Sequence, residues 1–500
     1  MSEPIPTQAV NSQEEKVAGA FRSAMFWNIA NRSLTQMMSV GLFIFLTYRL
    51  DPAVFGVFAL GVVLVDYFNF QAQSAGVDAV VQDQDFSPRA LSSAFWASMT
   101  VFALATGALA LSGGWFAGIM NVPDLKSILP ALACTLLAVP FSIPPSAMLL
   151  AQHDFKGIAI RGILSTLLSG VAALAVAFGP APEWALVAQR AVSVTTASVF
   201  LMLRTRWFPM DGFAGNLARR YAAASSRIFA AQAISVSYMR ILDVVVGVSF
   251  GAAAVGLMRI AARFTDAMYG TFAAPIGSLW VVLLSGSKEQ GTDRASLLIR
   301  LTQMSALICL PVFAGLMLTA QDLVDLTLDE SYAAAGPILF VLAAAGLMIP
   351  ISYFRNHALT GMRRLNLLLG LSVVDIVIVL ISALALRHIS TEAIVASILV
   401  MFGVRSLITA PLMVGSLGAS WKDYASAMLP AYLATGVMAL TVWGVASQIS
   451  GEAAALRLSV KALAGASAYC AYILLVHRRW ADRAIGMLMS RGQLRKESSE

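Results

Sequence analysis

Charged and amide side chains recur at helical spacing inside four long apolar segments of this 500-residue chain. The first segment carries Asn28, Asn31, Arg32, Thr35, Gln36 and Ser39, and the second carries Asp66, Asn69 and Gln73. The third carries Gln232, Ser235, Arg240 and Asp243, and the fourth carries Arg259, Arg263 and Asp266. Steps of three and four residues place each set on one face of a helix. Arginine at such positions can bind an anion, and aspartate can exchange a proton.

The depth of these charges in a membrane makes them informative. Asp66 and Asp266 lie about 17 Å below the expected outer ends of their helices, near the midplane of a core ~30 Å thick. Seven such charges facing lipid would cost roughly 20 kcal/mol, at ~3 kcal/mol each. They must therefore face one another or water.

Two arrangements satisfy this requirement. In the structural one, Arg240 pairs with Asp243 and Arg263 with Asp266, which leaves Arg259 and Arg32 without partners. In the functional one, all of them line a water-filled cavity of slight positive charge, where planar guanidinium groups suit a diphosphate. We predict the second. The substrate-binding set is Arg32, Arg240, Arg259, Arg263, Asn28, Asn31 and Gln36, and the ion-coupling set is Asp66, Asp243 and Asp266.

The composition of the chain indicates which kind of secondary structure positions these residues. Hydrophobic residues make up 58% of the chain and charged residues 12%, about half the charge of a soluble domain. We therefore predict an all-α polytopic membrane protein with about fourteen transmembrane helices. The predicted spans are 27–49, 55–78, 93–112, 127–151, 158–178, 182–203, 226–250, 254–284, 297–319, 334–357, 365–387, 392–415, 426–447 and 454–476.

Orientation follows from the distribution of Lys and Arg. Of the 34 such residues, about 23 fall in alternate loops and tails on one side and about 5 on the other. This bias predicts a multi-pass protein with both termini in the cytoplasm. The same bias accounts for the net charge of +7, so the charge does not indicate a nucleic-acid-binding protein.

A weak internal repeat predicts two lobes. At an offset of about 200 residues Asp66 falls on Asp266, and at about 210 Pro140-x-Ser142 falls on Pro350-x-Ser352. The predicted parts are a cytoplasmic tail (1–25), an N-lobe of six spans (26–203), a cytoplasmic linker (204–225), a C-lobe of six spans (226–416), two further spans (417–476) and a basic cytoplasmic tail (477–500).

No residue set is typical of a cofactor, metal or catalytic site. The three cysteines and four histidines are isolated from one another, and no phosphate-binding loop of the G-x-x-x-x-G-K-[ST] type occurs. We predict that the chain is not an enzyme.

Short motifs then resemble a known family. The turn Arg49-Leu50-Asp51-Pro52-Ala53-Val54-Phe55-Gly56 is similar to the R-L-x-P-x-x-F/Y-G turn between the first two helices of bacterial polysaccharide transporters. Residues 79–82 with Asp85, residues 152–156 and the Val255-Gly256 turn resemble other turns of that group. The group is the O-antigen and exopolysaccharide flippase (Wzx-type) branch of the multidrug/oligosaccharidyl-lipid/polysaccharide exporter superfamily.

The resemblance implies a V-shaped pair of six-helix lobes around a central cavity, plus two extra C-terminal helices. It implies a flippase that moves an undecaprenyl-diphosphate-linked oligosaccharide across the bilayer by alternating access, for exopolysaccharide or lipopolysaccharide biosynthesis. Membrane lipids, a polymerase and a chain-length regulator are the other expected partners. In related flippases cavity arginines come from helices one, two and eight. Arg32 and Arg259 match the first and third, whereas span two carries Asp66, so Arg240 or Arg263 would supply the missing contact.

Two other functions stay open on the sequence. A polytopic glycosyltransferase or polysaccharide polymerase would need acidic groups in an outer loop, where Asp322, Asp325, Asp329 and Glu330 are the candidates; a solvated acidic face is the preferred interpretation of that cluster. A drug/cation antiporter of the same superfamily would favour an acidic cavity, whereas the predicted one is slightly basic.

Overall fold

The computed structural model describes residues 34–152, 154–210, 212–277, 280, 284, 294–352, 354–361, 365–415, 420–449 and 451–478. Helices and turns are the elements found in these ranges. The chain divides into two compact units, Met1–Val236 and Ser237–Glu500, and the division falls within a helix. The all-α architecture predicted from composition is confirmed.

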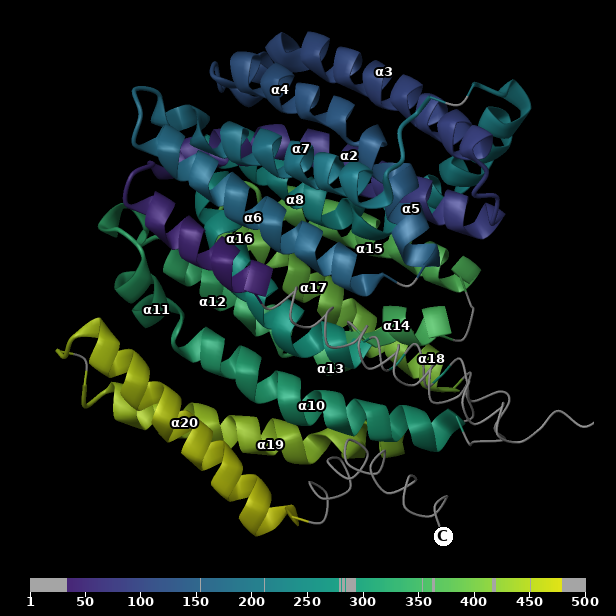
Figure 1. Ribbon diagram of the computed structural model, residues 1–500. Helices are drawn as coiled ribbons and strands as arrows, with labels where there is room; N and C mark the ends of the chain where they lie inside the picture. The colour runs from purple at the N-terminus through teal and green to yellow at the C-terminus, as the bar shows by residue number, and fades with distance from the viewer. Residues whose placement is uncertain are drawn as a thin grey trace, which may run out of the picture. The chain divides into compact units, whose positions relative to one another are not determined.

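Unit 1 is built from six long helical segments and the start of a seventh. Its elements are Leu34–Thr47, α2 (Pro52–Asp83), α3 (Pro88–Met120), α4 (Leu125–Cys134), η1 (Thr135–Ala138), η2 (Pro140–Ser142), α5 (Ile143–Ala151), α6 (Phe155–Ala177), η3 (Pro182–Trp184), α7 (Ala185–Thr205) and the first part of α8 (Gly215–Met268). Figure 1 shows α6 lying beside α7. Proline is the first residue of both α2 and α3. At this position the backbone N–H that proline lacks would have no acceptor within the helix.

Unit 2 contains the rest of α8 and everything that follows it. Its elements are η4 (Tyr269–Ala273), α10 (Arg294–Leu318), α11 (Ala320–Thr327), η5 (Glu330–Tyr332), α12 (Ala335–Gly346), α13 (Ile349–Ser352), α14 (Phe354–Gly361), α15 (Leu365–Leu386), α16 (Thr391–Val395), α17 (Ser397–Val404), η6 (Arg405–Thr409), α18 (Ala410–Gly415), α19 (Trp421–Ala446) and α20 (Ala454–Val476). The last two lie side by side (Figure 1). Gly465 allows this close approach, because a Cβ there would meet Val442 Cγ2 at 3.0 Å.

Ten helices of the described ranges are long and apolar enough to cross a membrane, or eleven if the bent pair Ala335–Gly346 and Ile349–Leu359 counts as one. The chain is thus a multi-pass membrane protein. The total of fourteen stays a prediction, because several predicted spans run into residues outside the described ranges.

Two spans are broken where proline interrupts the helix, one in each unit. The break around Pro140 forms η1 and η2, and Ser198 Oγ donates a hydrogen bond of 2.7 Å to the Ala138 carbonyl there. The 49° bend before Pro350 leaves the Leu347 carbonyl to accept a 2.8 Å hydrogen bond from the Tyr432 hydroxyl. Neighbouring side chains thus satisfy backbone groups that lipid could not. These are the two segments that the weak repeat aligns.

Candidate functional site

The site in unit 2 depends on a reversal of the chain within α8. A straight helix of its 54 residues would be about 81 Å long, far beyond a ~30 Å core. Gly251 interrupts it with φ 80° and ψ −177°, a combination open to glycine. Arg259 and Asp243 form an ion pair although sixteen residues separate them, about 24 Å along a straight helix. Each lies eight residues from Gly251, so α8 is a hairpin whose arms bring the two residues to the same depth.

Asp243 is the centre of this charge cluster. Its carboxylate is buried, and besides Arg259 it contacts Arg240 Nη1 at 3.8 Å. Both arginines remain about a quarter to a third exposed, at 26% and 30% of the side-chain surface. The cluster therefore has one carboxylate for two guanidinium groups, and these groups keep surface that can contact a ligand.

Arg259 was expected to lack a protein partner, and this expectation is wrong. Pairing by sequence spacing considered neighbours at three and four residues, whereas the turn at Gly251 supplies a partner sixteen residues away. Arg263 lies one turn beyond Arg259 and is partly buried, and Asp266 is exposed and makes none of the ion pairs found within the described ranges.

In unit 1 the structure joins two residues from different spans. Arg190 Nη2 of α7 lies 2.5 Å from Asp66 Oδ1 of α2, and both side chains are partly buried. The contact is an ion pair without hydrogen-bond geometry, so Nε and Nη2 of Arg190 make no hydrogen bond within the described residues. The buried Oδ1 of Asn69, one turn from Asp66, likewise has no partner there. Further along the stripe, Gln73 Nε2 donates to Ser142 Oγ at 2.8 Å.

The remaining predicted site residues are placed only in part. Gln36 lies on the helix Leu34–Thr47 and is partly buried. Asn28, Asn31 and Arg32 lie outside the described residues. The residues that the structure groups are therefore Arg240, Asp243 and Arg259 in unit 2, and Asp66 with its partner in unit 1.

Arg190 is a residue that sequence reasoning missed. It appeared as an isolated charge within a span, yet a charge at that position needs a counter-charge. Counted from positions 203 and 78, the ends of the predicted spans, Arg190 lies about 20 Å and Asp66 about 18 Å into its helix. This match in depth was the available signal.

A second buried cluster joins three residues of unit 2. Arg355 Nη2 contacts Asp375 Oδ2 at 2.9 Å, and Arg405 binds the same carboxylate through Nε at 2.7 Å and Nη2 at 2.6 Å. All three are buried. Arg355 lies at the start of α14, just beyond the bend, and Arg405 opens the π-helix η6. The cluster therefore connects the irregular parts of two spans to the middle of the regular helix α15.

Two residues of the acidic cluster around α11, Asp322 and Asp325, form ion pairs. Asp322 is buried, and its carboxylate contacts Arg457 Nε at 2.7 Å and Lys461 Nζ at 2.5 Å. Arg457 Nη2 also reaches Asp325 Oδ2 at 3.0 Å. Asp329 accepts from the Ser331 backbone N–H at 3.2 Å. The solvated face preferred from the sequence is wrong for Asp322, because α20 covers it.

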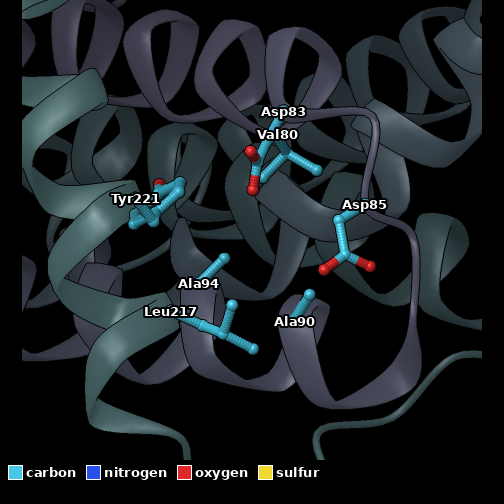
Figure 2. A pocket seen from close by; sticks show the side chains of 7 residues that line it. All are labelled: Val80, Asp83, Asp85, Ala90, Ala94, Leu217 and Tyr221. Carbon is cyan, nitrogen blue, oxygen red and sulfur yellow. The ribbon is translucent and has the colours of Figure 1, made fainter.

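A small hollow lies elsewhere, in unit 1. Its empty volume, open solvent included, is about 280 Å³, and it is lined by Val80, Asp83, Asp85, Ala90, Ala94, Leu217 and Tyr221. Figure 2 shows the carboxylates of Asp83 and Asp85 around it. Its acidic lining and the pairing of Asp83 with Arg220 make it unsuited to an anion. The described residues include no group of three or more His, Cys, Asp or Glu side chains arranged to hold a metal.

Comparison with known sequences identifies relatives along most of the chain. The family described as "Polysaccharide biosynthesis protein" matches residues 46–337. The teichuronic acid biosynthesis protein TuaB of Bacillus subtilis (strain 168) is 22% identical over 405 residues, which cover 78% of this chain and 82% of that protein. The succinoglycan biosynthesis transport protein ExoT of Rhizobium meliloti (strain 1021) is 20% identical over 332 residues, covering 66% and 67%.

Solved structures show the same fold. The lipid II flippase MurJ in an inward closed conformation superposes with a TM-score of 0.73 at 11% identity, over 91% of this chain and 99% of that one. An inward-facing multidrug resistance MATE family transporter of the MOP superfamily gives 0.55 at 14% identity, over 79% and 95%. These matches confirm the resemblance to polysaccharide transporters noted in the sequence. Because the family match spans more than half of its residues, the chain belongs to the polysaccharide biosynthesis protein family.

Proposed function

We propose that this protein is a flippase that moves a polyprenyl-diphosphate-linked oligosaccharide across a bacterial inner membrane by alternating access. Its family and the names of its relatives, which include a succinoglycan biosynthesis transport protein and a lipid II flippase, support transport of a lipid-linked saccharide. The expected place of action is exopolysaccharide or lipopolysaccharide biosynthesis.

The observation that carries the proposal is the excess of guanidinium over carboxylate in the α8 hairpin. The hairpin holds three arginines and two aspartates. Arg240 and Arg259 share Asp243 and keep exposed surface. Arg263 follows one turn later, near Asp266. A membrane helix would not retain this excess without an anion or water to face, because each charge in lipid costs ~3 kcal/mol. A diphosphate fits, since its oxygens accept paired hydrogen bonds from a planar guanidinium fork. We propose that Arg32 and Gln36, with Asn28 and Asn31, complete the substrate contacts.

Leaflet exchange in proteoliposomes tests this function. Purified protein is reconstituted with a fluorescent polyprenyl-diphosphate sugar, and exchange is followed by quenching the outer leaflet. We expect exchange with the wild-type chain and an about tenfold slower rate for Arg259→Lys, which keeps the charge for Asp243 but loses the planar fork. Arg387→Lys, at the exposed outer end of α15, is the matched control and should exchange normally. Wild-type rates for both Arg259→Lys and Arg263→Lys would refute diphosphate binding by this hairpin.

We propose that the Asp66–Arg190 pair couples transport to protons. Protonation of Asp66 would remove the counter-charge of Arg190, whose Nε and Nη2 have hydrogen-bonding capacity to spare. The unmatched Asn69 Oδ1 nearby supports a water at this place, since buried polar atoms are normally satisfied. Asp243, held by two arginines, and Asp266 are the other coupling candidates.

A pH gradient across the proteoliposome membrane tests the coupling. Asp66→Asn should remove the dependence of exchange on the gradient, and the reversed pair Asp66→Arg/Arg190→Asp should restore protein yield without restoring that dependence. The control is Asp83→Asn, because Asp83 lies on the same helix and also pairs with an arginine. Exchange in this variant should still depend on the pH gradient. Gradient-dependent exchange in Asp66→Asn would exclude this residue as the coupling group.

The same assay addresses the other two functions. A glycosyltransferase or polymerase would yield a covalent product, but Asp322 and Asp325, its candidate acids, are bound to Arg457 and Lys461. A drug/cation antiporter would give neither exchange nor product, and would instead release a cationic dye against a proton gradient.

A further inference from the structure

The segment between α7 and α8 exposes apolar side chains where a loop should be polar. Phe208 is 41% exposed, Met210 is 84% exposed and Phe213 is 59% exposed. All three fall within six residues that join two spans, and we call residues 206–214, without Asp211, the linker loop. Water contact at these positions is unfavourable in proportion to the apolar area.

The linker loop is fixed at both ends to the beginning of α3. Trp207 is buried and its ring lies 6.1 Å from that of Phe95. Toward the other end, the Ala214 backbone N–H donates a 3.0 Å hydrogen bond to Ser93 Oγ. Ser93 and Phe95 lie in the first two turns of the candidate span Pro88–Met120, and the candidate span Pro182–Thr205 ends just before the loop. Two candidate span ends meet here, as expected for a loop that lies near the membrane boundary.

Around the loop, five arginines outnumber the carboxylates of Asp83, Asp85 and Asp154 among the described residues. Arg89, Arg206 and Arg219 are exposed and form none of the ion pairs found within the described residues. Arg204 and Arg220 are also exposed, but they contact Asp154 and Asp83 respectively. Apolar side chains flanked by arginine are typical of segments that enter the boundary between headgroups and acyl chains.

We propose that the linker loop rests in the headgroup layer of the leaflet that the Lys and Arg bias predicts to be cytoplasmic, with Phe208, Met210 and Phe213 inserted. The partner is the phospholipid surface, and anionic headgroups strengthen the contact through Arg206, Arg219 and Arg89. This inference goes beyond substrate transport, since it concerns how the segment between α7 and α8 is anchored.

A fluorescent depth probe tests the insertion. In a background without Cys134, Cys309 and Cys470, Met210→Cys is labelled with bimane and the full-length protein is reconstituted in phosphatidylcholine vesicles with or without phosphatidylglycerol. The matched control is Asn216→Cys, which is also exposed and lies on the first turns of α8. We expect headgroup-level spin-labelled lipid to quench the probe at 210 about threefold more than the probe at 216, and aqueous iodide to quench it less.

Two other outcomes would overturn the proposal. Equal quenching by iodide at 210 and 216 would mean that the loop is in water. Protection of the probe at 210 from both iodide and lipid would mean that protein covers it.

A charge variant tests the headgroup preference separately. Phosphatidylglycerol should increase lipid quenching at 210, and Arg206→Gln/Arg219→Gln should remove that increase while leaving quenching in phosphatidylcholine unchanged. If phosphatidylglycerol still increases lipid quenching at 210 in this variant, these arginines are not the groups that bind anionic headgroups.

Discussion

Three aspartates of the described spans pair with an arginine from another helix or from the far arm of a hairpin. Asp66 of α2 obtains Arg190 from α7, and Asp243 obtains Arg259 across the turn at Gly251. Asp375 of α15 obtains Arg405 from η6. The physical cause is the same in all three, since a lone charge in lipid is far costlier than a paired one. Residue types alone therefore identified the positions that need partners, but not the partners.

At the membrane boundary, Asp154 gives a prediction with a defined pH window. Its carboxylate accepts a 2.9 Å hydrogen bond from the Gly157 N–H at the start of α6 and contacts Arg204 Nη2 at 2.9 Å. Partial burial opposes ionisation, but the Gly157 hydrogen bond and the Arg204 charge hold the pKa of Asp154 below its ordinary value of 3.8. The stability that ionised Asp154 contributes is therefore present above pH 3.8 and is lost as the pH falls through the lower, folded-state pKa.

We expect Asp154→Asn to lower the stability of the detergent-solubilised protein by about 1 kcal/mol at pH 7, and by much less near pH 3. Thermal unfolding at both pH values measures the difference. Asp124→Asn is the control, because Asp124 precedes α4 without a side-chain capping hydrogen bond. If the stability difference between the wild-type chain and Asp154→Asn is the same at pH 7 and pH 3, the asparagine acts through its shape and not through the lost charge.

At the scale of elements, the Arg355–Asp375–Arg405 cluster connects the segment after the α13 bend to α15 and to the π-helix η6. We expect Asp375→Asn to destabilise the protein by about 3 kcal/mol or more, since it leaves two buried arginines without their shared counter-charge. Arg355→Met should destabilise the protein less, because the ion pair between Asp375 and Arg405 remains. Chemical unfolding monitored by tryptophan fluorescence provides the comparison.

Replacing the whole cluster separates its electrostatic role from its packing. The triple variant Arg355→Met/Asp375→Leu/Arg405→Met should regain most of the stability lost in Asp375→Asn, since buried ion clusters are replaceable by apolar groups of similar size. A triple variant as unstable as Asp375→Asn would mean that the loss comes from packing.

The N-terminal end of the last helix, α20, is held by α11. Asp322 and Asp325 contact Arg457 and Lys461 of α20. We expect Asp322→Asn to increase hydrogen exchange in the first turns of α20 by at least about tenfold, because α20 loses two ion pairs to a buried carboxylate. Asp329→Asn is the control, since Asp329 bonds to Ser331 within its own turn. Unchanged exchange in Asp322→Asn would show that contact with α19 alone holds the helix.

At the scale of the whole molecule, the hairpin in α8 fixes how the chain crosses the membrane. We expect Ala253→Cys, beside the turn, to react with a membrane-impermeant maleimide added outside intact cells, and Asn216→Cys to react only after permeabilisation. A cysteine-free background removes the native thiols. Labelling of both positions from the same side would mean that α8 does not cross the membrane between them, and would reverse or remove one predicted span.

The sequence by itself determined the class of the molecule, because apolar length and charge asymmetry act locally and need no knowledge of contacts. It also determined which residues are too costly to face lipid, among them Asp66, Asp243 and Arg259. Motifs at turns identified the family.

Only the tertiary structure decided how those charges pair. Arg190 reaches Asp66 from a helix more than a hundred residues later, and Asp322 finds Arg457 at a similar separation. Such pairs depend on which helices lie side by side, and helices that are apolar on every face carry little information on that choice. The turn at Gly251 falls between the predicted spans 226–250 and 254–284, so the sequence predicted the reversal, but the pairing of Asp243 with Arg259 across it came from the tertiary structure.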